Sequence, residues 1–393
     1  MEHIYLDNAA TTQVKKEVLD AMIPYFTQNF GNPSSVYKIA QINKKALDES
    51  RETIAKAIGA QTNEIFFTSG GTEADNWAIK GIAEAHKAKG NHIITTKIEH
   101  HAVLHTCEFL EKQGYEVTYL DVDENGLVNP EDVEKAIKDT TILISIMYAN
   151  NEIGTIMPIK EIGEIAKKHK IAFHTDAVQA IGQVRIDVKE QNIDLLSLSA
   201  HKINGPKGTG ILYIRRGLKV TNLIHGGAQE RGRRAGTENV AGIVGFAKAM
   251  ELAYTDFDAK IERITRLRDK LIDGLLTSIP YTKLNGHRTQ RLANNVNIGA
   301  EFVEGESLLL LLDMHGIAAS SGSACTSGSL DPSHVLLSLG IPHEKAHGSI
   351  RFSLGDMTTE EQIDYVLEKM PPIVERMRQM SPLYEDFLKE QNK

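Results

Sequence analysis

The feature that most constrains the fold is a regular alternation of short apolar runs and longer amphipathic patterns between residues 65 and 214. Runs such as EIFFTS, NHIITTK and LLSLSA have the length and residue types of buried strands. Stretches with an apolar face at helical spacing separate them, for example Ala74, Trp77, Ala78 and Ile82. Strands that alternate with helices form a parallel or mixed sheet covered on both faces. The sequence therefore predicts an α/β fold with a large, mostly parallel mixed sheet.

The pattern changes near residue 255. A long, charged amphipathic helix follows, and NNVNIG and GSIRFSLG indicate strands of a separate, smaller α+β unit. The helical pattern of TTEEQIDYVLEKMPPIVERMRQM is expected to be interrupted at Pro371–Pro372. A chain of 393 residues is long for one domain. We therefore predict a large domain over 16–254 and a small domain formed by 1–15 and 255–393.

Charge and cysteine content exclude several classes of protein. The chain has 44 basic and 52 acidic residues and a formal charge of -8, which argues against a nucleic-acid surface. The N-terminus shows no signal-peptide pattern, and the apolar run from Leu308 to Leu312 is far too short to cross a bilayer. Two cysteines indicate a reducing compartment without a disulfide framework. We expect a cytoplasmic protein that contacts neither nucleic acid nor membrane.

Two glycine-containing loops have features of anion sites. In TSGGTEADN, glycines lie between a strand and a helix, where backbone N–H groups and the helix dipole can hold a phosphate at Gly71 and Thr72. A plain strand-to-helix turn is the alternative. RRAGTEN places two arginines and a threonine around a glycine turn, which suits an anion or a solvated basic loop.

Two other loops follow buried strands with a charged residue. Asp176 in HTDAVQA is a carboxylate that needs a cationic partner, such as a protonated ring nitrogen, or it caps a helix. Lys202 in SLSAHKINGPKGTG is costly after an apolar strand unless it is used covalently, and Ser199 and His201 lie beside it. A phosphate site, a carboxylate and a lysine are the parts that hold pyridoxal phosphate.

An ordered set of motifs spans nearly the whole chain: YLDNAATT, GNPSS, SGGTEADN, NNEIG, TDAVQ, SAHKINGPKG, RRAGTEN, SSGSACTSG and SIRFSLG. In this set the chain resembles the cysteine desulfurases of the NifS/IscS type, which belong to the class V group of fold-type I pyridoxal-phosphate enzymes. The resemblance implies an enzyme that takes sulfur from L-cysteine, releases L-alanine and passes the sulfur to an acceptor protein. That acceptor would be an iron–sulfur cluster scaffold or a tRNA-thiolation enzyme. The resemblance also implies a homodimer.

Roles for individual residues come from the matching motifs. The resemblance implies that Lys202 forms the Schiff base with pyridoxal 5'-phosphate and removes the Cα proton, that Asp176 pairs with the ring nitrogen, and that His100 stacks on the ring. It also implies that Asn151 and Gln179 contact the ring oxygen. The phosphate would be held by Gly71, Thr72, Ser199, His201 and Thr237 of a second subunit. The substrate would be bound by Asn32, Asn151 and Arg351, whose planar guanidinium suits a carboxylate.

The segment SSGSACTSGS, within a loop of about 320–332, places Cys325 among small residues that favour a mobile chain. The resemblance implies that its thiolate takes the sulfur as a persulfide. A thiol on such a tether can visit the cofactor and then an acceptor. Cys107 lies instead in the amphipathic stretch VLHTCEFL and is expected in the core.

Several alternatives remain. His101 and His105 have a spacing that suits a metal, but no further ligand lies nearby, so no metal is expected. A selenocysteine lyase or another class V lyase is the alternative enzyme, and a non-catalytic relative is the alternative outside enzymes. After GNPSS, where the family commonly has a histidine, this chain has VYKIAQ, which leaves the substrate entrance undefined.

Overall fold

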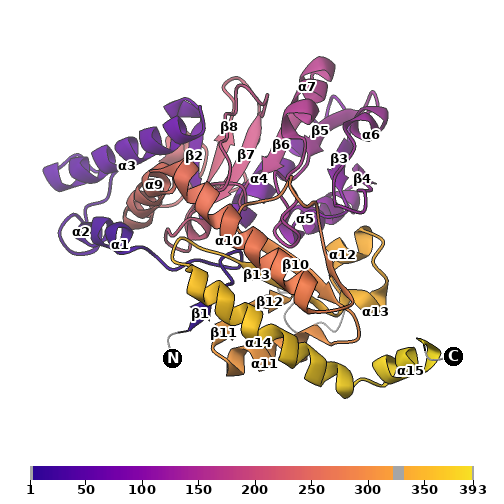
Figure 1. Ribbon diagram of the computed structural model, residues 1–393. Helices are drawn as coiled ribbons and strands as arrows, with labels where there is room; N and C mark the ends of the chain where they lie inside the picture. Colours follow the sequence, from indigo (N-terminus) through magenta and orange to yellow (C-terminus); the bar gives the residue numbers. More distant parts are fainter. Residues whose placement is uncertain (1–2, 322–331, 392–393) are drawn as a thin grey trace.

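The computed structural model describes residues 3–321 and 332–391 (Figure 1). Its largest element is a seven-stranded sheet. The strands, in spatial order, are β2 (Ile65–Thr68), β8 (Gly210–Ile214), β7 (Leu195–Ser199), β6 (Ala172–Asp176), β5 (Thr141–Ser145), β3 (His92–Thr96) and β4 (Glu116–Leu120). Strand β8 is antiparallel to both neighbours, whereas the other pairs are parallel. This sheet confirms the predicted α/β class.

Helices cover both faces of the large sheet because successive strand residues point to opposite sides. One face packs against α4 (Gly71–His86) and α5 (His101–Glu111), with Phe66, Ile93 and Leu212 in that cluster. The other face contributes Phe67, Ile94 and Tyr213 to a cluster with residues of α3 (Lys38–Ala57), α7 (Ile159–His169) and α9 (Val240–Tyr254). The remaining short elements of this part are α1 (Lys16–Met22), α2 (Pro24–Thr27), η1 (Thr62–Glu64), α6 (Pro130–Lys135), η2 (Ala200–Lys202) and α8 (Gln229–Gly232).

A second, four-stranded antiparallel sheet belongs to the C-terminal part. Its order is β12 (Ser320–Ser321), β13 (Ser349–Ser353), β10 (Asn295–Ala300) and β9 (Thr282–Leu284). Strand β1 (Ile4–Tyr5) pairs separately with β11 (Ile317–Ala318). Long helices α10 (Phe257–Ser278) and α14 (Glu360–Gln379) run side by side along this part (Figure 1). The other helices are α11 (Gly305–Met314), α12 (His334–Ser338), α13 (His343–Ala346) and α15 (Pro382–Gln391).

The C-terminal part has its own hydrophobic cluster, which takes in Leu6 and residues between Ile264 and Met377. On this separation we propose the two domains with a boundary in the gap between α9 and α10. The separation is not complete in the core, because Leu292 and Leu336 pack in the cluster of the large sheet.

One expectation was wrong. Helix α14 continues through Pro371–Pro372. The two missing N–H groups would bond the carbonyls of Leu367 and Glu368, which lie on the half-buried and exposed side of the helix, where water can replace them. Buried Met370 and Val374 hold the helix on the core of the small sheet on either side of the prolines. Tertiary packing therefore outweighs the local cost of the prolines.

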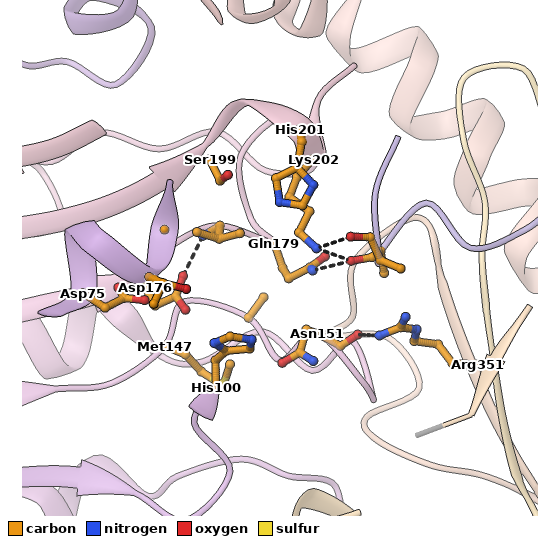
Figure 2. Close-up of a pocket in the computed structure, with 16 residues that line it drawn as sticks. Asp75, His100, Met147, Asn151, Asp176, Gln179, Ser199, His201, Lys202 and Arg351 are labelled. Carbon is orange, nitrogen blue, oxygen red and sulfur yellow. Dashed lines mark hydrogen bonds between the residues drawn. The ribbon is translucent and has the colours of Figure 1, made fainter. Parts of the chain in front are cut away.

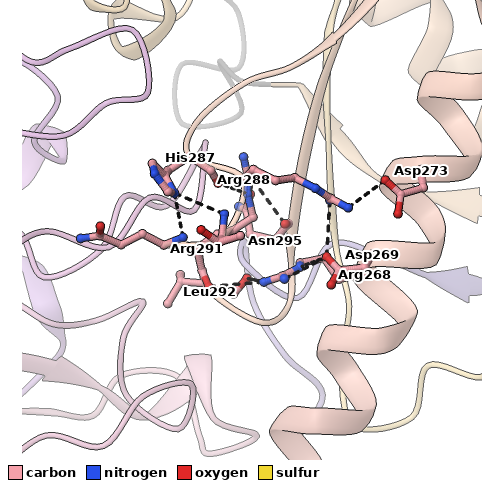
Figure 3. A network of polar contacts seen from close by, with 10 residues as sticks. Arg268, Asp269, Asp273, His287, Arg288, Arg291, Leu292 and Asn295 are labelled. Carbon is pink, nitrogen blue, oxygen red and sulfur yellow. Dashed lines mark hydrogen bonds and ion pairs between the residues drawn. The ribbon is translucent and has the colours of Figure 1, made fainter.

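A polar network surrounds Arg291 in the small domain (Figure 3), and through Asn295 and Leu292 it bonds to the loop 150–156 of the large domain. Buried Arg291 donates to the backbone oxygen of His287 at 2.9 Å and to the side-chain oxygen of Asn295 at 3.0 Å. The side-chain amide of Asn295 in turn donates to the backbone oxygen of Glu152 at 3.1 Å, and the N–H of Leu292 donates to that of Gly154 at 2.9 Å. The position of the 150–156 loop thus depends on the small domain.

Within the described ranges, no helix combines the length and the apolar composition that a bilayer crossing requires.

Candidate active site

A cavity of about 370 Å³ lies at the carboxyl ends of the central strands, between the large sheet and β13 (Figure 2). All predicted site residues within the described ranges line it, except Asn32 and Thr237. They are Gly71, Thr72, His100, Asn151, Asp176, Gln179, Ser199, His201, Lys202 and Arg351. The structure therefore brings together residues that are up to 280 positions apart in the chain, from Gly71 to Arg351.

The strands bring these side chains together by a change of residue type along their length. On the side that faces α4, β6 runs from Ala172 through His174 to Asp176, and β7 runs from Leu195 through Ser197 to Ser199. The apolar beginnings pack in the core, and the polar ends meet at one edge of the sheet, where sites of α/β proteins form.

One end of the cavity is built to hold an anion. Gly70 has φ 156 and ψ -177, a conformation that is strained for any residue with a side chain. A Cβ atom at Gly71 would lie 2.8 Å from Cγ2 of Val178, so the backbone approaches closely there. Thr72 lies in the first turn of the 16-residue α4, where N–H groups have no partner within the helix. Backbone donors therefore point at this end of the cavity.

Ser199 and His201 extend the same end from the other side, and an adjoining hollow shares both with Gly71 and Thr72. Nδ1 of His201 lies 3.1 Å from the Thr11 hydroxyl. Burial, with the charges of Lys202 and Lys207, lowers the pKa of His201 to about 4. The imidazole is therefore neutral at physiological pH and can donate one hydrogen bond to an anion.

Lys202 lies in the middle of the cavity wall, in η2 directly after β7. Its Nζ donates to the backbone oxygens of Ala9 at 2.5 Å and Ala10 at 2.9 Å. The side-chain amide of Gln179 donates to the same Ala9 oxygen at 2.9 Å (Figure 2). Neutral carbonyls hold the amine, and these bonds can be exchanged for a ligand at moderate cost.

Asp176 and His100 lie on the other sides of the cavity (Figure 2). Asp176 is buried and accepts from the N–H of Val178 at 2.9 Å. Burial raises its pKa to about 6, and the charge of Lys202 counteracts part of that rise. His100 accepts from the N–H of Ala102 at 3.1 Å and so caps α5. Burial and then the charge of Lys202 lower its pKa to about 4, so its ring is a neutral, flat surface.

Arg351 approaches from the small domain and is only 2% exposed. Its Nη1 donates to the backbone oxygen of Asn151, and its Nη2 donates to a carboxylate oxygen of Asp7, both at 3.0 Å. Its Nε is buried and has no hydrogen-bond partner among residues 3–321 and 332–391. An unused donor on a buried guanidinium beside a cavity suits an incoming carboxylate.

Several further residues belong to the site. Asp7, Ala9 and Ala10 come from YLDNAATT. The sequence feature that could have indicated them is an acidic residue and two small residues directly after the first strand. Asp75 also lines the cavity, and its signal was a carboxylate within the apolar face of α4.

Two predicted residues, Asn32 and Thr237, are not at the cavity within this chain. Asn32 is exposed, and its side chain accepts from the N–H of Ser34 at 2.9 Å. Thr237 is exposed between α8 and α9. Cys325 lies outside the described residues, as does most of its tether. Cys107 is fully buried in α5, as expected, and burial raises its pKa to about 12.

Two other candidate sites from the sequence are the RRAGTEN loop and the pair His101 and His105. Arg234 of RRAGTEN pairs with Glu73, Nε to Oε1 at 2.8 Å, and so ties that loop to the first turn of α4. His101 and His105 lie one turn apart on α5, with ring centroids 4.9 Å apart. Across residues 3–321 and 332–391, no group of three or more His, Cys, Asp or Glu side chains could hold a metal ion.

The cavity as a whole fits a phosphorylated ring that carries a basic nitrogen and an aldehyde. Backbone donors lie at one end, and a buried carboxylate, an amine and a neutral imidazole line the other sides. Each feature complements one group of such a molecule, and Arg351 leaves a donor for a second, carboxylate-bearing ligand.

Comparisons with known proteins agree with this chemistry. A family model described as Aminotransferase class-V matches residues 4–366. A protein named Cysteine desulfurase IscS from Clostridium botulinum strain Hall is 63% identical over 390 residues, which cover 99% of this chain and 98% of that protein. A solved structure described as NifS-like protein is 40% identical with a TM-score of 0.90, covering 95% of this chain and 99% of that one. Another, described as SspA in complex with cysteine, is 38% identical with a TM-score of 0.81, covering 91% and 100%.

Proposed function

The chain belongs to the class-V aminotransferase family, and from this membership and the cavity we infer that it is a cysteine desulfurase. It removes sulfur from L-cysteine, gives L-alanine and leaves a persulfide on Cys325. The observation that carries this proposal is the amine of Lys202 at the centre of a cavity with an anion cradle at one end and a buried carboxylate at another.

The resident cofactor we propose is pyridoxal 5'-phosphate, which supplies an electron sink for negative charge at the substrate's Cα. Asp176 would face its ring nitrogen, and His100 would lie against the ring. Asn151 and Gln179 would contact the ring oxygen. The phosphate would be held by Gly71, Thr72, Ser199 and His201, which meet at one end of the cavity.

The chain's own residues then have distinct tasks. Arg351 would bind the substrate carboxylate, which gives its buried Nε an acceptor. Lys202 Nζ, in its neutral form, would take the proton from the Cα of cysteine. The thiolate of Cys325 would attack the substrate sulfur, so that an S–S bond forms and the C–S bond breaks. The electron pair of the broken bond stays with Cβ, which takes a proton and becomes the methyl group of alanine, and a proton returns to Cα.

The test is turnover by the purified protein loaded with pyridoxal phosphate. We expect alanine from L-cysteine and a persulfide on the protein. Lys202→Ala should lose both products, because no other amine lines the cavity among the described residues. Cys325→Ser should keep the bound cofactor and lose the persulfide. Cys107→Ser, the control, should keep both the cofactor and the persulfide. Sustained sulfur transfer by Cys325→Ser, or full turnover by Lys202→Ala, would overturn the proposal.

The partners we propose are a sulfur-acceptor protein and a second copy of this chain, in the cytoplasm. Asn32 and Thr237 are exposed and away from the cavity of their own chain, as expected for residues that serve a partner. Phe30 and Val36, near Asn32, are 72% and 92% exposed. Large apolar side chains that gather on a surface commonly mark a protein interface.

A further inference from the structure

The floor of the cavity contains a second buried carboxylate that the proposed chemistry does not use. Asp75 is 1% exposed and lies on the face of α4 that packs on the sheet, next to the buried side chains of Ala78 and Ile79. It lines the cavity beside Asp176 (Figure 2). A carboxylate in such a position is costly unless its charge is balanced or removed.

Asp75 ends a chain of buried polar side chains. Its carboxyl group shares a hydrogen bond with Ser197, and the Ser197 hydroxyl lies 3.0 Å from Nε2 of His174. Nδ1 of His174 lies 2.9 Å from the hydroxyl of Ser145. All four residues face one another from α4, β7, β6 and β5, between the sheet and the helix.

The charges around Asp75 are mainly negative. Asp176 and His174 face it from β6, and Glu99 faces it from the loop after β3. The charge of Lys202 acts on Asp176. Oδ1 of Asp75 lies 3.5 Å from Nε2 of His174 and has no hydrogen-bond partner in the described part of the chain. An ionised carboxylate would leave half of its charge unsatisfied on that oxygen, whereas the carbonyl oxygen of a neutral acid loses much less.

We propose that Asp75 carries a proton and donates it in a hydrogen bond to Ser197, so that Asp176 alone presents a negative charge to the cofactor. Asp75 is then a positioning residue that acts through Asp176. This proposal shares one premise with the proposed function, namely that the cavity holds a cofactor with a protonated ring nitrogen.

The protonation preferences of the neighbours agree with this arrangement. Burial, and then the charge of Asp176, raise the pKa of Asp75 well above its ordinary value, and the hydrogen bond with Ser197 counteracts part of that rise. The N–H of Val178 and the charge of Lys202 favour the ionised form of Asp176. Of two adjacent carboxyl groups, the one with less support for its charge takes the proton. Burial lowers the pKa of His174 to about 3, so its imidazole is neutral and offers one donor and one acceptor.

The hydrogen bonds can therefore run in one direction. The Asp75 hydroxyl donates to Ser197, the Ser197 hydroxyl donates to Nε2 of His174, and Nδ1–H of His174 donates to Ser145. Each contact then has one donor and one acceptor, and none of these four side chains carries a charge.

The decisive experiment is infrared difference spectroscopy of the cofactor-loaded protein near pH 7, parent minus Asp75→Asn. We expect a carbonyl-stretch band of a protonated carboxylic acid in the parent that shifts in heavy water and is absent from the variant. Glu99→Gln is the matched control, because it removes a different buried acid and should leave this band in place. A difference spectrum without the band would overturn the proposal, and so would a nitrogen NMR signal that shows both ring nitrogens of His174 protonated.

A second measurement is the dissociation constant of pyridoxal phosphate. Asp75→Asn keeps a neutral donor of the same shape, so the constant should stay within about threefold of the parent, whereas Asp176→Asn removes the facing charge and should weaken binding about 30-fold. Equal losses in the two variants would contradict the assignment. Neither readout requires turnover, so a protein without desulfurase activity would defeat the proposed function and leave this test intact.

Discussion

Arg351 shows how a single residue in the small domain can set substrate affinity in the large one. Its fork spans Asn151 and Asp7, and its buried Nε has no acceptor in the described part of the chain. Arg351→Lys keeps the charge and loses the fork. We expect KM for L-cysteine to rise about 10- to 100-fold with a smaller change in kcat, which steady-state kinetics would measure. Arg378→Lys, at an equally buried arginine outside the cavity, is the control; an unchanged KM in Arg351→Lys would argue against the role.

Asp176 predicts a pH dependence of cofactor binding. Its pKa is raised to about 6, so it gains a proton as the pH falls through 6 and then cannot pair with a protonated ring nitrogen. The dissociation constant of pyridoxal phosphate should rise about tenfold for each pH unit below that value. Fluorescence titration of the cofactor-free protein between pH 5 and 7.5 would measure it. Asp176→Asn should bind weakly with no such slope, and a flat profile for the parent would contradict the pairing.

Charged residues at strand ends were predictable, and charged residues on helices were not. Lys202 and Asp176 come at the ends of apolar strands, where burying a charged side chain is unfavourable unless the charge has a function. Both line the cavity. Asp75 lies among apolar residues of a helix, and its place in the motif TSGGTEADN predicts no separate role for it. Asn32 and Thr237 depend on contacts that one chain does not contain, and no pattern in the sequence says which chain they serve.

At the scale of elements, the loop 150–156 is held in place by the network around Arg291 (Figure 3). Arg291→Met would remove the donor from the buried backbone oxygen of Asn285 and from the partly buried backbone oxygen of His287. We expect a loss of about 2–4 kcal/mol in the free energy of unfolding, with faster hydrogen exchange at 150–156. Chemical denaturation and exchange mass spectrometry would measure both.

The control for this network is Arg288→Met. Arg288 is partly exposed and pairs with Asp269 and Asp273 on the surface of α10. Its loss should cost less than about 1 kcal/mol. If both variants were equally stable, the buried network would not hold the loop.

Elements were predicted well wherever one face is apolar and the length fits. The strands of the large sheet follow the alternating runs, because buried parallel strands leave little room for polar residues at their centres. Helix α14 was mispredicted at Pro371–Pro372, since local preference ignores the core that Met370 and Val374 reach. Only the tertiary structure tells how much packing offsets two prolines.

At the scale of the whole molecule, we expect a dimer of the 43.4 kDa chain. Phe30→Glu would place a charge on the exposed apolar surface near Asn32 and should shift the mass toward the monomer and weaken cofactor binding. Light scattering after gel filtration would measure the mass. Met314→Glu, at an equally exposed apolar residue of α11, is the control. A parent protein that stays monomeric at micromolar concentration would remove this proposal.

The two halves of the molecule meet through segments that the sequence alone could not connect. Ala9 and Ala10 accept from Lys202, and Asp7 accepts from Arg351, so the segment that follows β1 joins residues of both domains. The predicted boundaries followed a change in pattern along the chain, and such a change carries no information about contacts between residues far apart in sequence.

The burial of Cys107 also has a practical consequence. With its sulfur enclosed in α5 and its pKa near 12, it will stay unreactive toward alkylating reagents while the protein is folded. Any adduct that forms under native conditions therefore reports on Cys325 without mutagenesis. A second adduct, on Cys107, would show that the core around α5 has unfolded. The number of adducts per chain therefore distinguishes the folded from the unfolded protein.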